Sequence, residues 1–329
     1  METDSPRRRP RERVRWRTAA VLAVVAGFFA LTLVSRWHQV TAVKWSLAPG
    51  YFAVACLLLA SSYALVAGLW AVALAKVAAT PVAAGVRIWF LANLARYVPG
   101  NVWSFVGAVE LARREGAPRR TTLAVMALTQ ALSVGVALLV GLPVLAAERA
   151  RLGRSALLGL AVAVALVALV VVGWRPLERL ARRRFPESGL LLDRVLHRGA
   201  GAGADAAVLP PLWATAGLAG GYAAYWGLTG LAFAALVRSI FPLAPSAVPL
   251  AVAGYAAAYA VGFLSLLTPA GLGVREGVLV LALGPVLPAG PALVVALVSR
   301  LWMMVFELLG ATVAYLLDRA LRRDPARAG

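Results

Sequence analysis

Long runs of uncharged, mainly apolar residues recur along nearly the whole chain. A helix that crosses the hydrocarbon core of a membrane needs about 20 consecutive apolar residues. Runs of this kind cover residues 18–35, 45–75, 121–147, 155–174, 208–237 and 291–317, the last of them interrupted by Arg300 and Glu307. The pattern predicts an all-α integral membrane protein with six full spans.

Clusters of arginine beside these runs predict which ends of the spans face the cytoplasm. Cytoplasmic loops of membrane proteins carry an excess of Arg and Lys. Basic residues gather in the tail 1–17, in the loop 175–207 and in the tail 318–329. We therefore expect a multi-pass protein of the cell membrane with both termini in the cytoplasm. One loop that this arrangement places outside disagrees, because it contains Arg149, Arg151 and Arg154.

Two further segments begin and end on the same side of the membrane in this arrangement. They lie near residues 81–112 and 248–288, and they start close to Pro81 and Pro249. Each is interrupted by a Pro-Gly element, which is typical of a helix break. Broken helices in corresponding positions of two halves are typical of inverted-repeat transporters. We predict two re-entrant helical hairpins in an inverted repeat; two ordinary, kinked helical hairpins are the alternative.

The predicted organisation has four parts. Residues 1–17 form a basic cytoplasmic tail, and residues 18–154 form the first transmembrane repeat. Residues 155–317 form the second repeat with a cytoplasmic linker at 175–207, and residues 318–329 form a second cytoplasmic tail. The apolar runs leave no room for a separate catalytic domain.

Composition agrees with a membrane location and argues against several other classes of protein. Hydrophobic residues make up 61% of the 329 residues, and a soluble domain of this length needs more charged surface. The net charge of +19 comes from the arginine clusters that follow the topology, so we expect no nucleic-acid partner. Cys56 is the single cysteine, and His38 and His197 are isolated. We therefore expect no metal site, no cofactor, no catalytic residues and no enzymatic activity.

Five ionisable residues are predicted to lie near the middle of the membrane. Arg96 precedes the first break, Arg275 and Glu276 follow the second, and Arg300 and Glu307 lie about two turns apart on the last span. A charge at that depth costs about 2.5 to 3.5 kcal/mol. In the structural explanation, Arg300 pairs with Glu276 or Glu307, and this pairing lowers the cost of placing the charges in the membrane. The functional explanation is that three arginines against two glutamates leave positive charge for a ligand phosphate.

The two breaks supply a second feature that suits an anion. The start of a helix carries free N–H groups and partial positive charge, and a short helix follows each break. Asn101 is a suitable N-cap for the first of them, and Gly273 precedes the second. The candidate substrate-binding residues are therefore Arg96, Pro99, Gly100, Asn101, Pro269, Gly271, Gly273, Arg275, Glu276, Arg300 and Glu307.

Four short motifs follow one another along the chain. They are LARYVPGNVWS at residues 94–104, REG at 114–116, TPAGLGVREG at 268–277, and Arg300 in the last apolar run. In this order they resemble the flippase-like transmembrane region found in lysylphosphatidylglycerol synthases and in many stand-alone membrane proteins. The resemblance covers residues 18–317 and implies a lipid-translocating or lipid-associated role. The chain resembles the stand-alone members, because it has no counterpart of the synthases' aminoacyl-transferase domain.

Together these features predict the translocation, or flipping, of an anionic lipid between membrane leaflets. The expected ligand is a phospholipid or a polyprenyl-linked intermediate with an anionic or phosphate headgroup. Two alternatives stay open: a non-transporting membrane partner of a lipid- or glycan-synthesis enzyme, and a secondary transporter of a soluble anion. A cavity that opens sideways to lipid distinguishes lipid transport from transport of a soluble anion. The sequence leaves the oligomeric state open.

Overall fold

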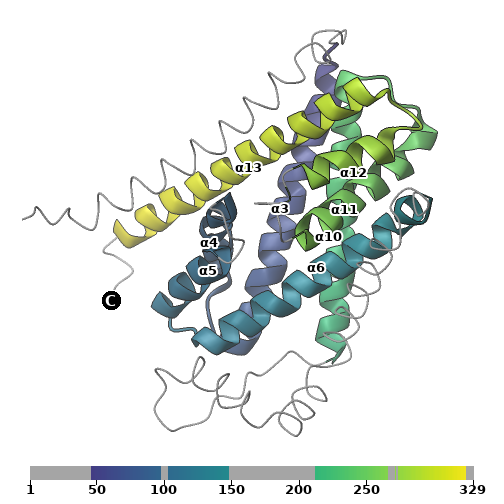
Figure 1. Cartoon of the computed structure of the whole chain (residues 1–329). Helices are drawn as coiled ribbons and strands as arrows, with labels where there is room; N and C mark the ends of the chain where they lie inside the picture. The colour runs from purple at the N-terminus through teal and green to yellow at the C-terminus, as the bar shows by residue number, and fades with distance from the viewer. Residues whose placement is uncertain (1–45, 98–102, 148–211, 266–270, 272, 324–329) are drawn as a thin grey trace, which may run out of the picture.

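The computed structural model of the chain is built from helices (Figure 1). It describes residues 46–97, 103–147, 212–265, 271 and 273–323. Within these ranges every regular element is an α-helix or a short 3-10 helix, and no strand occurs. The predicted all-α class is therefore confirmed for the described part of the chain.

The helices follow the same order in two parts of the chain. The elements of the first part are α3 (Pro49–Ala78), α4 (Val82–Asn93), η1 (Leu94–Tyr97), α5 (Trp103–Arg114) and α6 (Arg119–Ala147). The elements of the second part are α10 (Leu212–Ile240), η2 (Pro245–Ala247), α11 (Val248–Leu264), α12 (Val274–Leu283) and α13 (Ala289–Arg323). Each part thus contains a long helix, two shorter helices with a break between them, and another long helix.

Five of the described helices are long and apolar enough to cross a membrane. They are Pro49–Ala78, Arg119–Ala147, Ala214–Ile240, Pro245–Leu264 and Ala289–Leu317. The multi-pass membrane character predicted from the sequence is therefore confirmed.

The number of full spans stays a prediction. The predicted spans 18–35 and 155–174 lie outside the described residues, as do the tail 1–17 and the linker 175–207. Pro245–Leu264, part of which the sequence assigns to a re-entrant hairpin, has the length and hydropathy of a full span. The corresponding helix α4 in the first part has only 12 residues. The re-entrant hairpins and the repeat boundaries therefore also stay predictions.

Prolines mark the beginnings of several helices. The first turn of a helix tolerates proline because its N–H groups have no partner inside the helix. Pro49 is the first residue of α3, Pro81 immediately precedes α4, and Pro249 lies in the first turn of α11. Helix α3 ends where Ala79 adopts a left-handed φ of 49°, a conformation that commonly terminates helices. The prolines from which the sequence predicted new segments thus coincide with helix starts.

Both predicted breaks lie between two helices. The first separates η1 from α5, and its residues 98–102 lie outside the described ranges. In the second, between α11 and α12, Gly271 and Gly273 have φ values of 68° and 82°, which favour glycine. A Cβ atom on Gly271 would also lie 2.7 Å from the carbonyl oxygen of Gly262. Both backbone conformation and space therefore require glycine at position 271.

Helices of the two parts pack closely against each other. Helix α3 lies against α10, and α6 lies against α11. A Cβ atom on Gly141 of α6 would lie 2.7 Å from the backbone of Ala257 in α11, so the two helices touch through their backbones at this point. Small residues permit such close approach between helices in a membrane. Apolar side chains fill most of the space between the helices and leave a cavity among them.

Candidate functional site

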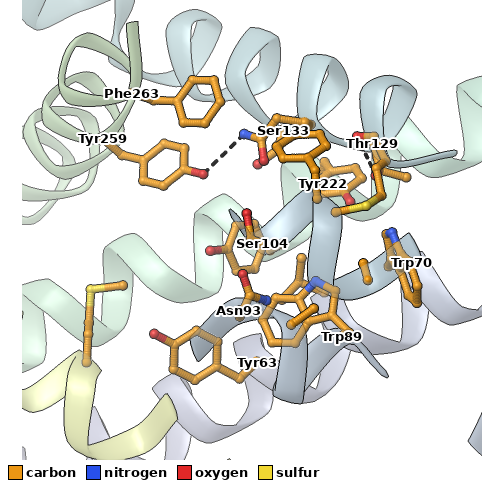
Figure 2. A pocket seen from close by; sticks show the side chains of 18 of the residues that line it. Tyr63, Trp70, Trp89, Asn93, Ser104, Thr129, Ser133, Tyr222, Tyr259 and Phe263 are labelled. Atoms are coloured by element: carbon orange, nitrogen blue, oxygen red, sulfur yellow. Dashed lines mark hydrogen bonds between the residues drawn. The ribbon is translucent and has the colours of Figure 1, made fainter. Parts of the chain in front are cut away.

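Each of the eight described α-helices contributes side chains to one cavity in the interior (Figure 2). The cavity has a volume of about 170 Å³ and is partly open to the exterior. Pockets that enclose a whole drug-sized ligand measure about 300 to 1,000 Å³. The cavity therefore has a suitable size for a lipid headgroup, and long acyl or prenyl chains have to stay outside it.

Aromatic side chains form a large part of the cavity wall. The ring centroids of Tyr63 and Trp89 lie 6.1 Å apart, and those of Tyr259 and Phe263 are stacked at 6.2 Å. The aromatic residues that line the cavity are Tyr63, Trp70, Trp89, Phe105, Tyr222, Tyr225, Tyr259 and Phe263. Since a tyrosine combines an apolar ring with a hydroxyl group, this wall offers both apolar faces and hydrogen-bonding groups.

Uncharged polar side chains line the same cavity. The side-chain amide of Gln130 donates a hydrogen bond to the hydroxyl of Tyr259 at 3.3 Å (Figure 2). The side chains of Asn93, Ser104 and Ser133 make no hydrogen bond to any other described residue. Polar groups in protein interiors nearly always have a partner. These three side chains are therefore available to a ligand or to water.

Arg300 and Glu276 form a buried ion pair at the cavity wall. Nη1 of Arg300 lies 2.7 Å from Oε1 of Glu276, and the two side chains are 7% and 8% exposed. Oε2 of Glu276 accepts a hydrogen bond of 2.7 Å from the backbone N–H of Gly273, the residue that precedes α12. Glu276 thus occupies the positive end of α12 while it neutralises Arg300. The sequence predicted that a ligand phosphate contacts Arg300 and the start of α12, and in the structure the carboxylate of Glu276 makes both contacts.

Arg275 also lines the cavity, and a buried tyrosine holds it in place. Its Cζ lies 4.8 Å from the ring centroid of Tyr255, and its Nη2 donates a hydrogen bond to the Tyr255 hydroxyl at 2.6 Å. The sulfur of Met303 contacts both of these groups. Cation–π contact and hydrogen bonding therefore fix the guanidinium between α11, α12 and α13.

Glu307 accepts a hydrogen bond from the hydroxyl of Tyr63, with 2.6 Å between the oxygens. Tyr63 and Glu307 are 3% and 2% exposed. Tyr63 itself lines the cavity, so this bond connects the cavity wall on α3 with a buried carboxylate on α13.

The structure brings together several of the predicted site residues. Arg275 and Arg300 line the cavity, and Glu276 pairs with Arg300. Gly271 and Gly273 form the turn that leads into α12. The predicted proximity of Arg275, Glu276 and Arg300 is therefore present, and it includes one of the two pairings considered from the sequence. Their role in substrate binding stays a prediction.

The other predicted site residues are placed differently. Glu307 is buried but does not line the described cavity. The backbone of Arg96 lies in η1, and its side chain is outside the described part of the structure. Four further predicted residues lie outside the described ranges, namely Pro99, Gly100, Asn101 and Pro269.

Sequence reasoning missed the uncharged residues that line the cavity. Gln130 carried the clearest signal, because an amide inside an apolar membrane span needs a partner. Tyrosines one helical turn apart carried a second signal: Tyr222 with Tyr225, and Tyr255 with Tyr259, stand in stretches rich in alanine and leucine. Tyr255 contacts Arg275, and the other four residues line the same cavity as the arginines.

Charged residues outside the cavity pair near the ends of helices. Glu110 bonds to Arg113 at 2.9 Å and lies 3.6 Å from Arg114. The hydrogen bond from Arg113 lowers the pKa of Glu110. Arg87 of α4 forms an ion pair with Glu115, which follows α5. Among the described residues, no group of three or more His, Cys, Asp or Glu side chains could hold a metal ion.

Comparison with known proteins agrees with the motifs noted in the sequence. The family model described as the lysylphosphatidylglycerol synthase TM region matches residues 18–310. The comparison with curated proteins gave no match. The matched region includes every described residue that lines the cavity. Because the match extends over most of the chain, this protein belongs to the family of the lysylphosphatidylglycerol synthase transmembrane region.

Proposed function

We propose that this protein moves an anionic lipid between the two leaflets of the cell membrane, with the headgroup passing through the cavity. The name of the family refers to the membrane part of a synthase that makes a phospholipid, which supports a role in membrane lipid biology. The observation that carries the proposal is the position of Arg275 and Arg300 on the wall of a headgroup-sized cavity. Arginines inside a membrane protein are costly and commonly mark the path of a substrate. We propose transport and no enzymatic reaction.

Glu276 provides a way for a phosphate to bind and to leave. Carboxylate and phosphate oxygens accept the same kind of hydrogen bond from a guanidinium group. A headgroup phosphate that enters the cavity takes the place of Glu276 at Arg300, and Arg275 supplies a second positive charge. Return of Glu276 to Arg300 releases the lipid.

The order of the helices supports an inverted repeat as the transport architecture. The helices α3 to α6 and α10 to α13 each contain a break between two shorter helices. In the proposed arrangement the two parts have opposite orientations in the membrane, and the broken segments are re-entrant hairpins that approach the cavity from opposite sides. Both termini then lie in the cytoplasm.

Lipid movement by the purified protein tests this proposal. In proteoliposomes we expect the wild type to move fluorescent phosphatidylglycerol between leaflets without nucleotide. Unlabelled phosphatidylglycerol should compete, whereas phosphate-free diacylglycerol should compete poorly. Arg300→Ala should slow the movement about tenfold or more, because one charge-assisted hydrogen bond is worth about 1.5 to 3 kcal/mol. Arg300→Lys should restore only part of the rate, because lysine lacks the planar fork of arginine.

Two controls separate transport from folding. Arg300→Ala strands the carboxylate of Glu276 and can cost about 3 to 5 kcal/mol of stability, so the double variant Arg300→Ala/Glu276→Gln is measured beside it. Arg113→Ala is the matched control, because this arginine is 51% exposed and pairs with Glu110 outside the cavity. Normal lipid movement by a folded Arg300→Ala protein, or equal competition by diacylglycerol, would refute the proposal and favour a non-transporting partner of a synthase.

A further inference from the structure

We propose that the headgroup recognised by the cavity is a hydroxylated ring attached through a phosphate, such as a hexosyl phosphate or an inositol phosphate, and not a cationic aminoacyl group. This inference rests on the proposed function and names its substrate class. It follows from the charges, the aromatic rings and the unpaired polar groups of the cavity.

The charges of the cavity disfavour a cationic headgroup. Arg275 and Arg300 line the cavity, and none of the described lining residues has a carboxylate. The nearby carboxylate of Glu276 is already bonded to Arg300 and to a backbone N–H. Aromatic rings attract cations, but Arg275 adds a positive charge to the cavity wall, beside the neutral pair of Arg300 and Glu276, and repels a lysyl ammonium group.

Aromatic rings beside hydrogen-bonding groups suit a hydroxylated ring. The C–H face of a pyranose or an inositol is apolar and packs on an aromatic face, whereas the hydroxyl groups at its rim need donors and acceptors. Tyr63 and Trp89 supply the aromatic faces, and Asn93 and Ser104 supply side-chain amide and hydroxyl groups on α4 and α5 (Figure 2). An acyl chain does not suit this cavity, because it displaces water from the polar side chains without offering them a hydrogen-bond partner.

Helix α6 supplies a second set of polar groups. The amide of Gln130 donates one hydrogen bond to Tyr259, which leaves its second N–H and its carbonyl oxygen for a ligand. Ser133 lines the cavity, and its hydroxyl group has no hydrogen-bond partner among the described residues. This hydroxyl group is therefore available to a ligand in the cavity. A ligand rich in hydroxyl groups supplies hydrogen-bond partners to the polar side chains of α4 and of α6 at the same time.

Matched pairs of lipids test the inference on the wild-type protein. Purified protein in phosphatidylcholine nanodiscs is titrated with hexosyl-phosphoprenol against a prenyl phosphate of the same chain, and with phosphatidylinositol against phosphatidic acid. We expect the lipid with the ring to bind about tenfold more tightly in at least one pair, a difference of about 1.4 kcal/mol. The bare phosphate monoester carries the larger negative charge, so electrostatics alone predicts the opposite order. The pair with the larger difference identifies a prenyl or a diacyl lipid as the source of the headgroup.

Variants link this preference to the cavity. Gln130→Leu and Asn93→Leu should each reduce the preference for the ring to about threefold or less, because each removes hydrogen bonds worth about 1 kcal/mol apiece. Trp89→Phe keeps an aromatic face and should retain most of the preference. If a variant does not fold, the comparison of lipid pairs on the wild-type protein still tests the proposed headgroup.

A third pair compares lysyl-phosphatidylglycerol with phosphatidylglycerol, and the lysyl group should not strengthen binding. Equal binding within the first two pairs, or clearly tighter binding of the lysyl lipid, would overturn the inference and leave the proposed function standing. Failure of every phosphate-bearing lipid to bind would overturn the proposed function as well.

Discussion

Replacement of Glu276 by glutamine tests whether this carboxylate competes with a lipid phosphate for Arg300. Glutamine has nearly the same shape as glutamate, but it has one side-chain oxygen, which can still accept the hydrogen bond from the N–H of Gly273. Its NH2 group then faces the guanidinium of Arg300, so the bond to Arg300, 2.7 Å long in the wild type, is lost. The substitution thus removes one interaction and leaves the helix start intact.

The size of the effect follows from the type of hydrogen bond. A bond between charged groups contributes about 1.5 to 3 kcal/mol, and a neutral bond about 0.5 to 1.5 kcal/mol. We therefore expect the free energy of unfolding of the lipid-free Glu276→Gln protein to fall by about 1.5 to 5 kcal/mol, because buried Arg300 loses the negative charge of Glu276. The competitor for the phosphate is removed, so the affinity for an anionic lipid should rise about tenfold or more.

Unfolding of the purified protein with and without phosphatidylglycerol measures both effects. A ligand that binds only the folded state stabilises it by RT ln(1 + L/Kd), where L is the free ligand concentration. Added lipid should therefore stabilise Glu276→Gln more than it stabilises the wild type. Glu110→Gln is the control, because this carboxylate is 41% exposed and pairs with Arg113 outside the cavity. If stability and lipid affinity fall together in Glu276→Gln, the carboxylate supports the site and does not compete with the ligand, and the proposed exchange at Arg300 is refuted.

Three further predictions concern the fold around the site. Tyr63→Phe should lower the free energy of unfolding by about 1 to 3 kcal/mol in chemical denaturation, because buried Glu307 loses a donor; an unchanged transition would contradict this assignment. Gly271→Ala should cost at least about 2 kcal/mol, because its φ of 68° and the nearby backbone both exclude a side chain, whereas Gly50→Ala, which has open space around it, should be close to neutral. In a Cys56→Ala background, single cysteines placed in the two breaks should react with membrane-impermeant reagents from opposite sides of the membrane. Labelling of both breaks from the same side would exclude the inverted repeat.

The sequence predicted the helix starts and the breaks because local chemistry decides them. Proline is disfavoured in the interior of a helix, and Pro81 and Pro249, from which the sequence predicted new segments, mark helix starts in the structure. Gly271 and Gly273 likewise mark the second break through their positive φ angles. Apolar runs predicted the long helices to within a few residues, since run 121–147 corresponds to α6 and run 45–75 to α3.

The choice of ion-pair partner required the tertiary structure. Arg300 and Glu307 lie on the same helix, but seven residues correspond to about 10.5 Å of rise. Glu276 comes to Arg300 from α12, which packs on α13. The walls of the cavity depended even more on packing, because they combine one to four residues from each of eight helices. No spacing along the chain connects Gln130 with Tyr259 or Asn93 with Ser133.

The contact between Gly141 and Ala257 has a mechanical consequence. Because the backbones of α6 and α11 touch at this point, the two helices cannot roll over each other there without separating. In the transport proposed above, a movement that opens the cavity would therefore have to keep α6 and α11 together at this point or separate them. A larger residue at position 141 would push α6 and α11 apart, because its side chain would meet the backbone of Ala257.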